Sequence, residues 1–284
     1  MKLITYTDPI PFAMKASPIL ERNEDVYSLF YGILESIKVG DYQHPFMAIL
    51  ENGGRVAALL QMTPPYPLNI IVVEEEHATA IVDELVVQLR EQSVSIPSVI
   101  GVKQVAFDFA SKWTNREVAT LEAVNEGIYR LDHIHSKLTY SEGDWRYANT
   151  QDAHLIEQWF TQFEIDAKLP PTSTDLVQQQ VAAFISNREV FVWEVAGQVV
   201  SMMKKARPTK HGVTVSMVFT PEIQRRKSYA RSLVAKVSAE LLKEYDFCIL
   251  FTDLANTTAN KIYQEIGYKQ IVEFAHVELL SNKK

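Results

Sequence analysis

The sequence has very little cysteine and no long apolar run, and each absence excludes a class of protein. Cys248 is the single cysteine among 284 residues, so no internal disulfide can form, and its apolar neighbours indicate a buried side chain. No run of about 18 apolar residues is present for a membrane helix. Asp8 interrupts the start of the chain where the core of a signal peptide would lie. We therefore expect a cytoplasmic protein with no membrane association.

Several catalytic signatures are also missing. No group of His, Cys and Asp residues has metal-ligand spacing, no Gly-rich loop ends in Gly-Lys-Ser/Thr, and no Gly-x-Ser-x-Gly elbow occurs. These absences disfavour metal-dependent, nucleoside-triphosphate and serine-hydrolase chemistry, and we expect no metal. The net charge of −7 disfavours general binding to nucleic acid or anionic membranes.

The composition that remains is typical of a globular protein, with 47% hydrophobic and 22% charged residues. A chain of this length suits two domains of roughly 100–200 residues each. A weak repeat supports this division, because two strand–turn–strand segments share four identities at an offset of 143 residues. Turns favour Gly and strands favour Val, so coincidence remains the alternative to a tandem pair of related domains. The identities are Glu51/Glu194, Gly54/Gly197, Val56/Val199 and Pro65/Pro208.

Hydrophobic periodicity predicts an α/β fold with a mixed β-sheet flanked by helices in each half. A polar stretch at residues 141–144 places the boundary, giving domains of residues 1–141 and 142–284. The first half is predicted to form helices at 26–37, 78–92, 102–113 and 116–126 and strands at 46–50, 55–62 and 70–73. The second half is predicted to form helices at 152–163, 176–185, 228–244 and 258–266 and strands at 190–195, 198–206, 213–220, 247–252, 268–274 and 276–279.

Residues 201–240 are strongly basic within an acidic chain. Nine Lys or Arg residues stand there against two Glu residues. The densest part, residues 224–230, lies between a predicted strand and a long predicted helix, where unpaired amides and the helix dipole favour an anion. The segment predicts a phosphate-binding turn. The alternative is a solvated turn whose basic residues serve solubility.

This turn resembles that of the GNAT superfamily of acyl-CoA N-acyltransferases. The family's turn reads Gln/Arg-x-x-Gly-x-Gly/Ala and binds the diphosphate of coenzyme A (CoA) through backbone amides. Arg225-Arg226-Lys227-Ser228-Tyr229-Ala230 matches it except at Ser228. The preceding Val218-Phe219-Thr220 is similar to the family's splayed strand, which pairs with pantetheine, and residues 252–268 are similar to its second CoA-contacting segment. The resemblance covers about residues 145–280.

The resemblance implies an acetyl-CoA-dependent N-acetyltransferase acting on a primary amine of a small molecule or protein. By this resemblance, Tyr263 would protonate the CoA thiolate and the backbone amide of Phe219 would stabilise the oxyanion. Tyr263 could instead be an interior aromatic, and Asn256 a helix cap. The CoA-binding residues that the resemblance implies are Val218, Phe219, Thr220, Gln224, Arg225, Arg226, Lys227, Ser228, Tyr229, Ala230, Asn256 and Asn260.

Two positions of the turn depart from the family's pattern. Arg226 and Ser228 stand where the family usually has Gly, the residue that most easily adopts a positive φ. If Ser228 is left-handed, the strain costs on the order of 1 kcal/mol. We therefore expect CoA binding to be weakened and not abolished.

The sequence also leaves alternatives open. No general base stands out, because Glu164 and Glu194 are each more typical of a surface or paired carboxylate. The first half lacks the CoA-binding turn and carries Glu74-Glu75-Glu76 after its third strand, so we expect a degenerate GNAT-like domain. The alternative function is a CoA-binding GNAT-like sensor or scaffold with little turnover. A third hypothesis, nucleic-acid binding by residues 225–227, is disfavoured by the net charge. The acceptor amine and the oligomeric state, monomer or homodimer, are not predicted.

Overall fold

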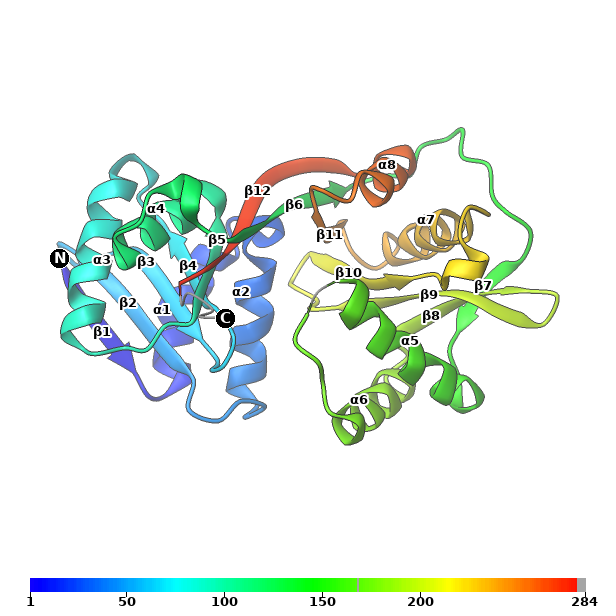
Figure 1. Ribbon diagram of the computed structural model, residues 1–284, viewed down its shortest axis with the longest axis horizontal. Helices are drawn as coiled ribbons and strands as arrows, with labels where there is room; N and C mark the ends of the chain where they lie inside the picture. The colour runs from blue at the N-terminus through cyan, green and yellow to red at the C-terminus, as the bar shows by residue number, and fades with distance from the viewer. Residues whose placement is uncertain (168, 280–284) are drawn as a thin grey trace. The chain divides into compact units, whose positions relative to one another are not determined.

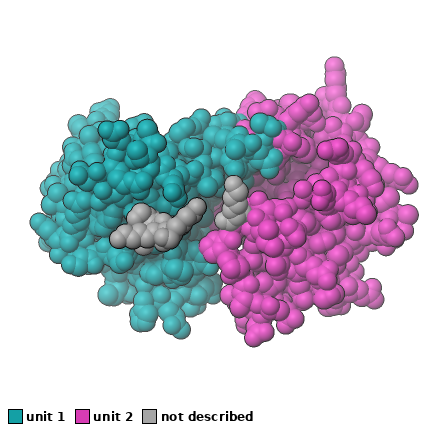
Figure 2. Space-filling model, viewed as in Figure 1, with its two compact units in different colours: residues 1–128, 251–257, 270–284 teal, residues 129–250, 258–269 magenta. Residues whose placement is uncertain are grey.

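A computed structural model describes residues 1–167 and 169–279. Its contacts divide the chain into two compact units (Figures 1 and 2). Unit 1 consists of residues 1–128, 251–257 and the chain from residue 270 onward, and unit 2 of residues 129–250 and 258–269. The chain passes between the units within β6 (Ala123–Leu131), β11 (Phe247–Asp253) and β12 (Lys269–Glu278). The division at residues 141/142 stays a prediction, but most of the C-terminal strand is grouped by its contacts with unit 1.

Unit 1 is a mixed sheet with helices on both faces. Its strands run in the order β1-β2-β3-β4-β5-β12, with β4 and β5 parallel and the other described pairs antiparallel. The elements are β1 (Lys2–Tyr6), α1 (Pro9–Leu20), α2 (Glu24–Lys38), β2 (Phe46–Asn52), β3 (Arg55–Met62), β4 (Leu68–Val72), η1 (Glu75–His77), α3 (Ala78–Glu91), β5 (Ser98–Val102), α4 (Lys103–Thr114) and η2 (Val118–Thr120).

The period-2 alternation of strand side chains accounts for the two cores of unit 1. Met47 and Ile49 of β2 pack with Phe30 in the cluster formed with α1 and α2. The intervening Ala48 and Leu50 belong to the cluster formed with α3 and α4. Both faces of the sheet are therefore buried, which is why β2 and β3 read as nearly continuous apolar runs.

Unit 2 repeats this plan with the strand order β11-β10-β9-β8-β7. Helices α5 and α6 cover one face, with Trp159 and Val181 packed on Val192 and Met202, and α7 lies on the other face (Figure 1). The elements are β7 (Asp144–Tyr147), η3 (Thr150–Asp152), α5 (Ala153–Asp166), α6 (Thr174–Ser186), β8 (Val190–Val195), β9 (Gln198–Ala206), β10 (Gly212–Phe219), η4 (Glu222–Gln224), α7 (Tyr229–Leu241) and α8 (Thr257–Ile266). Among the described residues, no helix combines the length and apolar character of a membrane span.

The two hairpins suspected of being related share backbone irregularities as well as residues. Both turns, Gly53-Gly54 and Ala196-Gly197, have positive φ at both positions, as tight hairpin turns require. The ladder also shifts register at Leu50/Glu51 in β2 and at Trp193/Glu194 in β8. The bulges thus keep the 143-residue offset of the sequence identities. Turn and strand preferences alone do not require a bulge at matching positions.

Some predicted elements differ from those observed. Residues 116–126 were predicted as a helix, which is wrong, because the chain forms η2 and then enters β6, where Ile128 and Leu131 are buried. Residues 268–279 form one strand, β12, instead of two. Helix α1 was not predicted, because prolines such as Pro18 obscure its pattern, although Asp8 caps it by accepting a hydrogen bond from the Ile10 amide at 2.8 Å.

Candidate functional site

Strand β10 is irregular at the end that leads to the basic turn. It pairs in parallel with β11 from Gly212 to Thr214, while its ladder with β9 shifts register between Ser216 and Phe219. Within this bulge Met217 has a φ of 49°. The bulge places Val218 between two paired positions and bends the strand where the pantetheine-binding segment is expected.

A buried serine orients the last peptide units of β10. The Ser201 hydroxyl of β9 donates to the Phe219 carbonyl oxygen at 3.0 Å and lies 2.8 Å from the Thr220 hydroxyl. Ser201 has no exposed surface, so water does not compete for these bonds. The peptide planes around the expected oxyanion donor are therefore held in a fixed orientation.

The turn between β10 and α7 presents a row of backbone amides. In the described part of the chain, no acceptor is found for the backbone amides of residues 226–230, whereas the Gln224 and Arg225 amides are bonded within η4. Arg226 and Ser228 are both left-handed, with φ of 64° and 62°. Such turns direct successive amides towards one side and form an anion-binding nest, to which the N-terminal dipole of α7 adds.

Basic side chains surround this nest, and most of them have partners. The Arg225 guanidinium pairs with Asp166 at 2.7 Å and donates to the Thr220 carbonyl at 2.9 Å. Lys227 donates to Gln224 at 2.9 Å. No partner for the Arg226 guanidinium is found within residues 1–167 and 169–279. Arg226 is therefore the cation of the turn most available to an anionic ligand.

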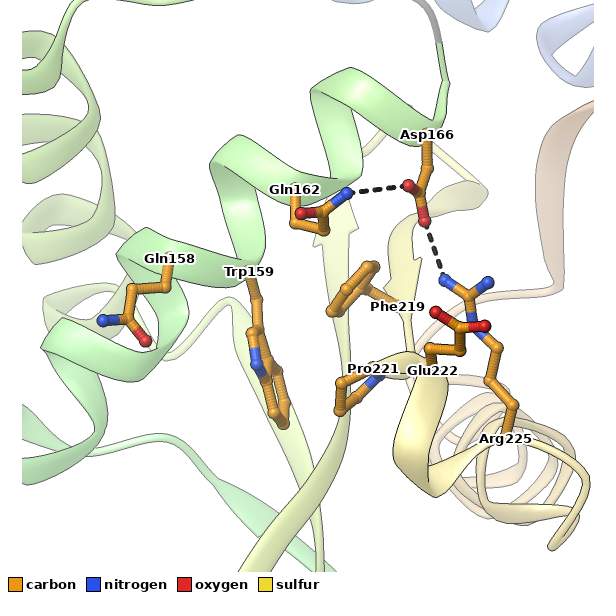
Figure 3. Close-up of a pocket in the computed structure, with 8 residues that line it drawn as sticks. All are labelled: Gln158, Trp159, Gln162, Asp166, Phe219, Pro221, Glu222 and Arg225. Carbon is orange, nitrogen blue, oxygen red and sulfur yellow. Dashed lines mark hydrogen bonds and ion pairs between the residues drawn. The ribbon is translucent and has the colours of Figure 1, made fainter.

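A cavity of about 370 Å³ lies beside the turn, between α5 and the end of β10 (Figure 3). Two tethers cross its rim, because Asp166 accepts from Gln162 at 2.9 Å through one oxygen and from Arg225 at 2.7 Å through the other. The Trp159 ring lies 5.7 Å from the Phe219 ring, so the wall is aromatic at one end and charged at the other. The lining residues are Gln158, Trp159, Gln162 and Asp166 of α5 with Phe219, Pro221, Glu222 and Arg225.

Helix α8 carries two of the expected residues on one buried face. Asn260 and Tyr263 are each 9% exposed and lie three positions apart on the helix. Burial raises the pKa of Tyr263 to about 12, so its hydroxyl stays protonated at neutral pH. The neighbouring Tyr268 ring lies 6.0 Å away, and the Tyr268 hydroxyl bonds to Ser238 of α7 at 2.9 Å. No described interaction joins Tyr263 to Phe219.

The remaining expected residues are placed as follows. Tyr229 and Ala230 begin α7. Asn256 directly precedes α8 and is exposed, and its amide donates to the Asp253 carbonyl at 2.9 Å. Asn256 is grouped with unit 1, so the structure does not bring it together with the turn of unit 2.

The two carboxylates considered as general bases are committed to structural contacts. Glu164 is buried and accepts bonds from the Thr172 amide and hydroxyl at 3.1 and 2.5 Å. Glu194 pairs with Arg146 at 2.6 Å. Neither is free to accept the amine proton. Over the described residues, no group of three or more His, Cys, Asp or Glu side chains could hold a metal ion.

The lining residues of α5 were missed as site residues, although the sequence carried a signal. Gln158, Gln162 and Asp166 recur every four positions and form a polar stripe beside the apolar stripe of the helix. A polar stripe is normally a solvated surface. Only the fold shows that this one faces Phe219 across a cavity.

Comparison with known proteins agrees with this geometry. Residues 195–277 match the family model described as FR47-like protein. No curated protein shows significant similarity to the chain.

Solved structures resemble the chain over nearly its whole length. An acetyltransferase of the GNAT family from Colwellia psychrerythraea is 14% identical, with 98% of this chain and 99% of that one covered and a TM-score of 0.60. A GCN5-related N-acetyltransferase from Sphaerobacter thermophilus is 14% identical (97% and 95% covered, TM-score 0.63). A tandem GNAT protein from the clavulanic acid biosynthesis pathway is 10% identical (99% and 100% covered, TM-score 0.58). The resemblance seen in the sequence is thereby confirmed at the level of the fold, and the chain has the α/β fold of the tandem GNAT acetyltransferases.

Proposed function

We propose that this protein is an acetyl-CoA-dependent N-acetyltransferase that transfers the acetyl group to a primary amine. The observation that carries the proposal is the row of amides at residues 226–230, which lie at the N-terminus of α7 beside the unpartnered Arg226. A diphosphate needs several convergent donors and a positive field, and this turn supplies both.

The departures from Gly at Arg226 and Ser228 do not prevent this fit. Both residues already hold the left-handed conformation in the fold, so the strain of about 1 kcal/mol at each is a cost in folding and not in binding. This argument supports retention of CoA binding by the turn.

Aminolysis of a thioester requires a stabilised oxyanion and a proton for the leaving thiolate. Acetyl-CoA, when bound, supplies the acyl group and the thiolate. We assign the Phe219 amide, at the bulged end of β10, to the oxyanion. We assign the proton to Tyr263, whose hydroxyl burial keeps protonated. With Glu164 and Glu194 engaged elsewhere, the proposal includes no protein base for the amine.

Calorimetric titration with acetyl-CoA tests the cofactor site. We expect micromolar binding to the wild type and binding at least about tenfold weaker in Arg226→Glu, because a carboxylate in the nest repels the diphosphate. Arg55→Glu makes the same charge change at an exposed hairpin end of unit 1 and should bind as the wild type does. Equal affinity in all three proteins would place the site elsewhere.

The alternative function, a CoA-binding sensor or scaffold, differs in turnover. Acetyl-CoA binding without thiol release from any primary amine would favour it.

A further inference from the structure

We propose that the cavity between α5 and β10 binds the acceptor, and that the acceptor is a small diamine-type molecule whose second, non-reacting ammonium group is held by Glu222 and Trp159. This inference rests on the proposed function, because it takes the cavity as the acceptor side of the same site. Its volume of about 370 Å³ is near the lower end of small-molecule pockets, roughly 300–1,000 Å³. A small ligand therefore fits better than a folded partner.

The charge of the cavity is the first argument. Three charged side chains line it: Asp166, Glu222 and Arg225. Asp166 and Arg225 neutralise each other at 2.7 Å. For the Glu222 carboxylate no hydrogen bond or ion pair is found in the described part of the chain. The cavity therefore has a net charge of −1 with an uncommitted carboxylate, which favours a cationic ligand and disfavours an amino acid or an acyl phosphate.

The lining is the second argument. Trp159 contributes the ring type that best attracts a cation, and Gln158 and Gln162 of the same helix add amide groups along the wall (Figure 3). Most ammonium groups are bound by this combination of carboxylate and aromatic face, because a carboxylate alone at an exposed site holds a cation weakly.

The position of Phe219 explains why two nitrogens are needed. Phe219 lines the cavity and carries the amide assigned to the oxyanion, so the reacting amine belongs at this end. That amine must be neutral when it attacks. The positive charge that Glu222 recognises is therefore a second group, separated from the reacting nitrogen by the length of the cavity.

Calorimetry with three amines of equal length tests the inference independently of turnover: 1,4-diaminobutane, 1-aminobutane and 4-aminobutanoate. Each is titrated into the wild type, both alone and with saturating CoA. We expect 1,4-diaminobutane to bind about tenfold more tightly than 1-aminobutane, and 4-aminobutanoate to bind most weakly. Equal binding of the three amines, or no binding of the diamine in either condition, would overturn the inference. Loss of diamine binding when CoA is added would also overturn it, because the cavity would then belong to the cofactor.

Variants of Glu222 locate the charge. Glu222→Gln should weaken diamine binding about five- to tenfold and leave 1-aminobutane binding unchanged, and Glu222→Asp should restore part of the affinity. The matched control is Glu244→Gln, which removes an exposed carboxylate of the same unit outside the cavity and should have no effect. An unchanged diamine affinity in Glu222→Gln contradicts the inference. Absent acetyl-CoA binding with intact, Glu222-dependent diamine binding would instead contradict only the proposed function.

Discussion

At the scale of single residues, burial decides what the site side chains can do. Tyr263 and Cys248 are both buried, and burial raises the pKa of each to about 12. For Tyr263 this keeps a proton available for a leaving thiolate. For Cys248 it suppresses the reactive thiolate, in agreement with the buried apolar role expected from its neighbours. The same physical effect thus favours a function at one position and removes it at the other.

The tyrosine pair on α8 and β12 allows a matched test. Tyr263→Phe should lower kcat by about 10²-fold, the usual contribution of a general acid, and leave acetyl-CoA affinity unchanged. Any alkaline loss of wild-type kcat caused by Tyr263 should be centred near pH 12 and not near pH 10. Tyr268→Phe removes a buried bond to Ser238 and should cost about 1 kcal/mol of stability with kcat retained. Equal loss of kcat and acetyl-CoA affinity in Tyr263→Phe would show that Tyr263 is structural.

At the scale of elements, the turn between β10 and α7 departs most from its usual sequence. Ser228 is left-handed at the start of α7, where an L side chain is strained and Gly is not. Gly would relieve this strain but would lose about 0.5–1 kcal/mol of backbone entropy on folding. The two effects nearly cancel at this position.

The Ser228→Gly variant should therefore change the free energy of unfolding by less than about 0.5 kcal/mol. Ala239→Gly places the same residue at an exposed interior position of α7 and should destabilise the protein by about 1 kcal/mol. Urea denaturation of both variants measures the difference. Equal destabilisation would show that Ser228 is not strained.

The elements of unit 2 were predicted more accurately than those of unit 1. Strands β8 to β11 and helices α5 to α8 have clear alternation or helical spacing. In unit 1, residues 116–126 carry mixed spacing, and the chain becomes a strand there because β6 gains ladder partners that a sequence pattern does not reveal. Local propensity is weak compared with such pairing, which accounts for this error.

At the scale of the whole molecule, the two units share one plan but differ in charge at the equivalent turn. Unit 1 has the order β4, η1, α3 where unit 2 has β10, η4, α7. Glu75 and Glu76 lie in η1, where unit 2 has its basic turn. We expect unit 1 not to bind CoA, because carboxylates repel a diphosphate.

The contacts of β12 predict that the chain cannot be divided at residue 141. Strand β12 pairs with all five residues of β5, and it adds Ala275 and Val277 to the core of unit 1. A fragment of residues 1–141 should therefore melt at a clearly lower temperature than the intact chain, since each buried aliphatic side chain contributes about 1.5–3 kcal/mol.

The control is residues 1–128 joined by a flexible linker to residues 269–279, which restores the strand and should restore cooperative melting. Circular dichroism compares the proteins. If the 1–141 fragment melts cooperatively at the temperature of the intact chain, β12 is dispensable to unit 1.

The sequence by itself determined the fold class, the basic turn and the order of its residues, because periodicity and a contiguous motif are local properties of a chain. Tertiary structure alone decided the rest. It assigned the C-terminal strand to unit 1, engaged Glu164 and Glu194 in structural bonds, and placed the polar stripe of α5 opposite Phe219. Each of these depends on contacts between residues distant along the chain, whose pairing is set by packing and not by local pattern.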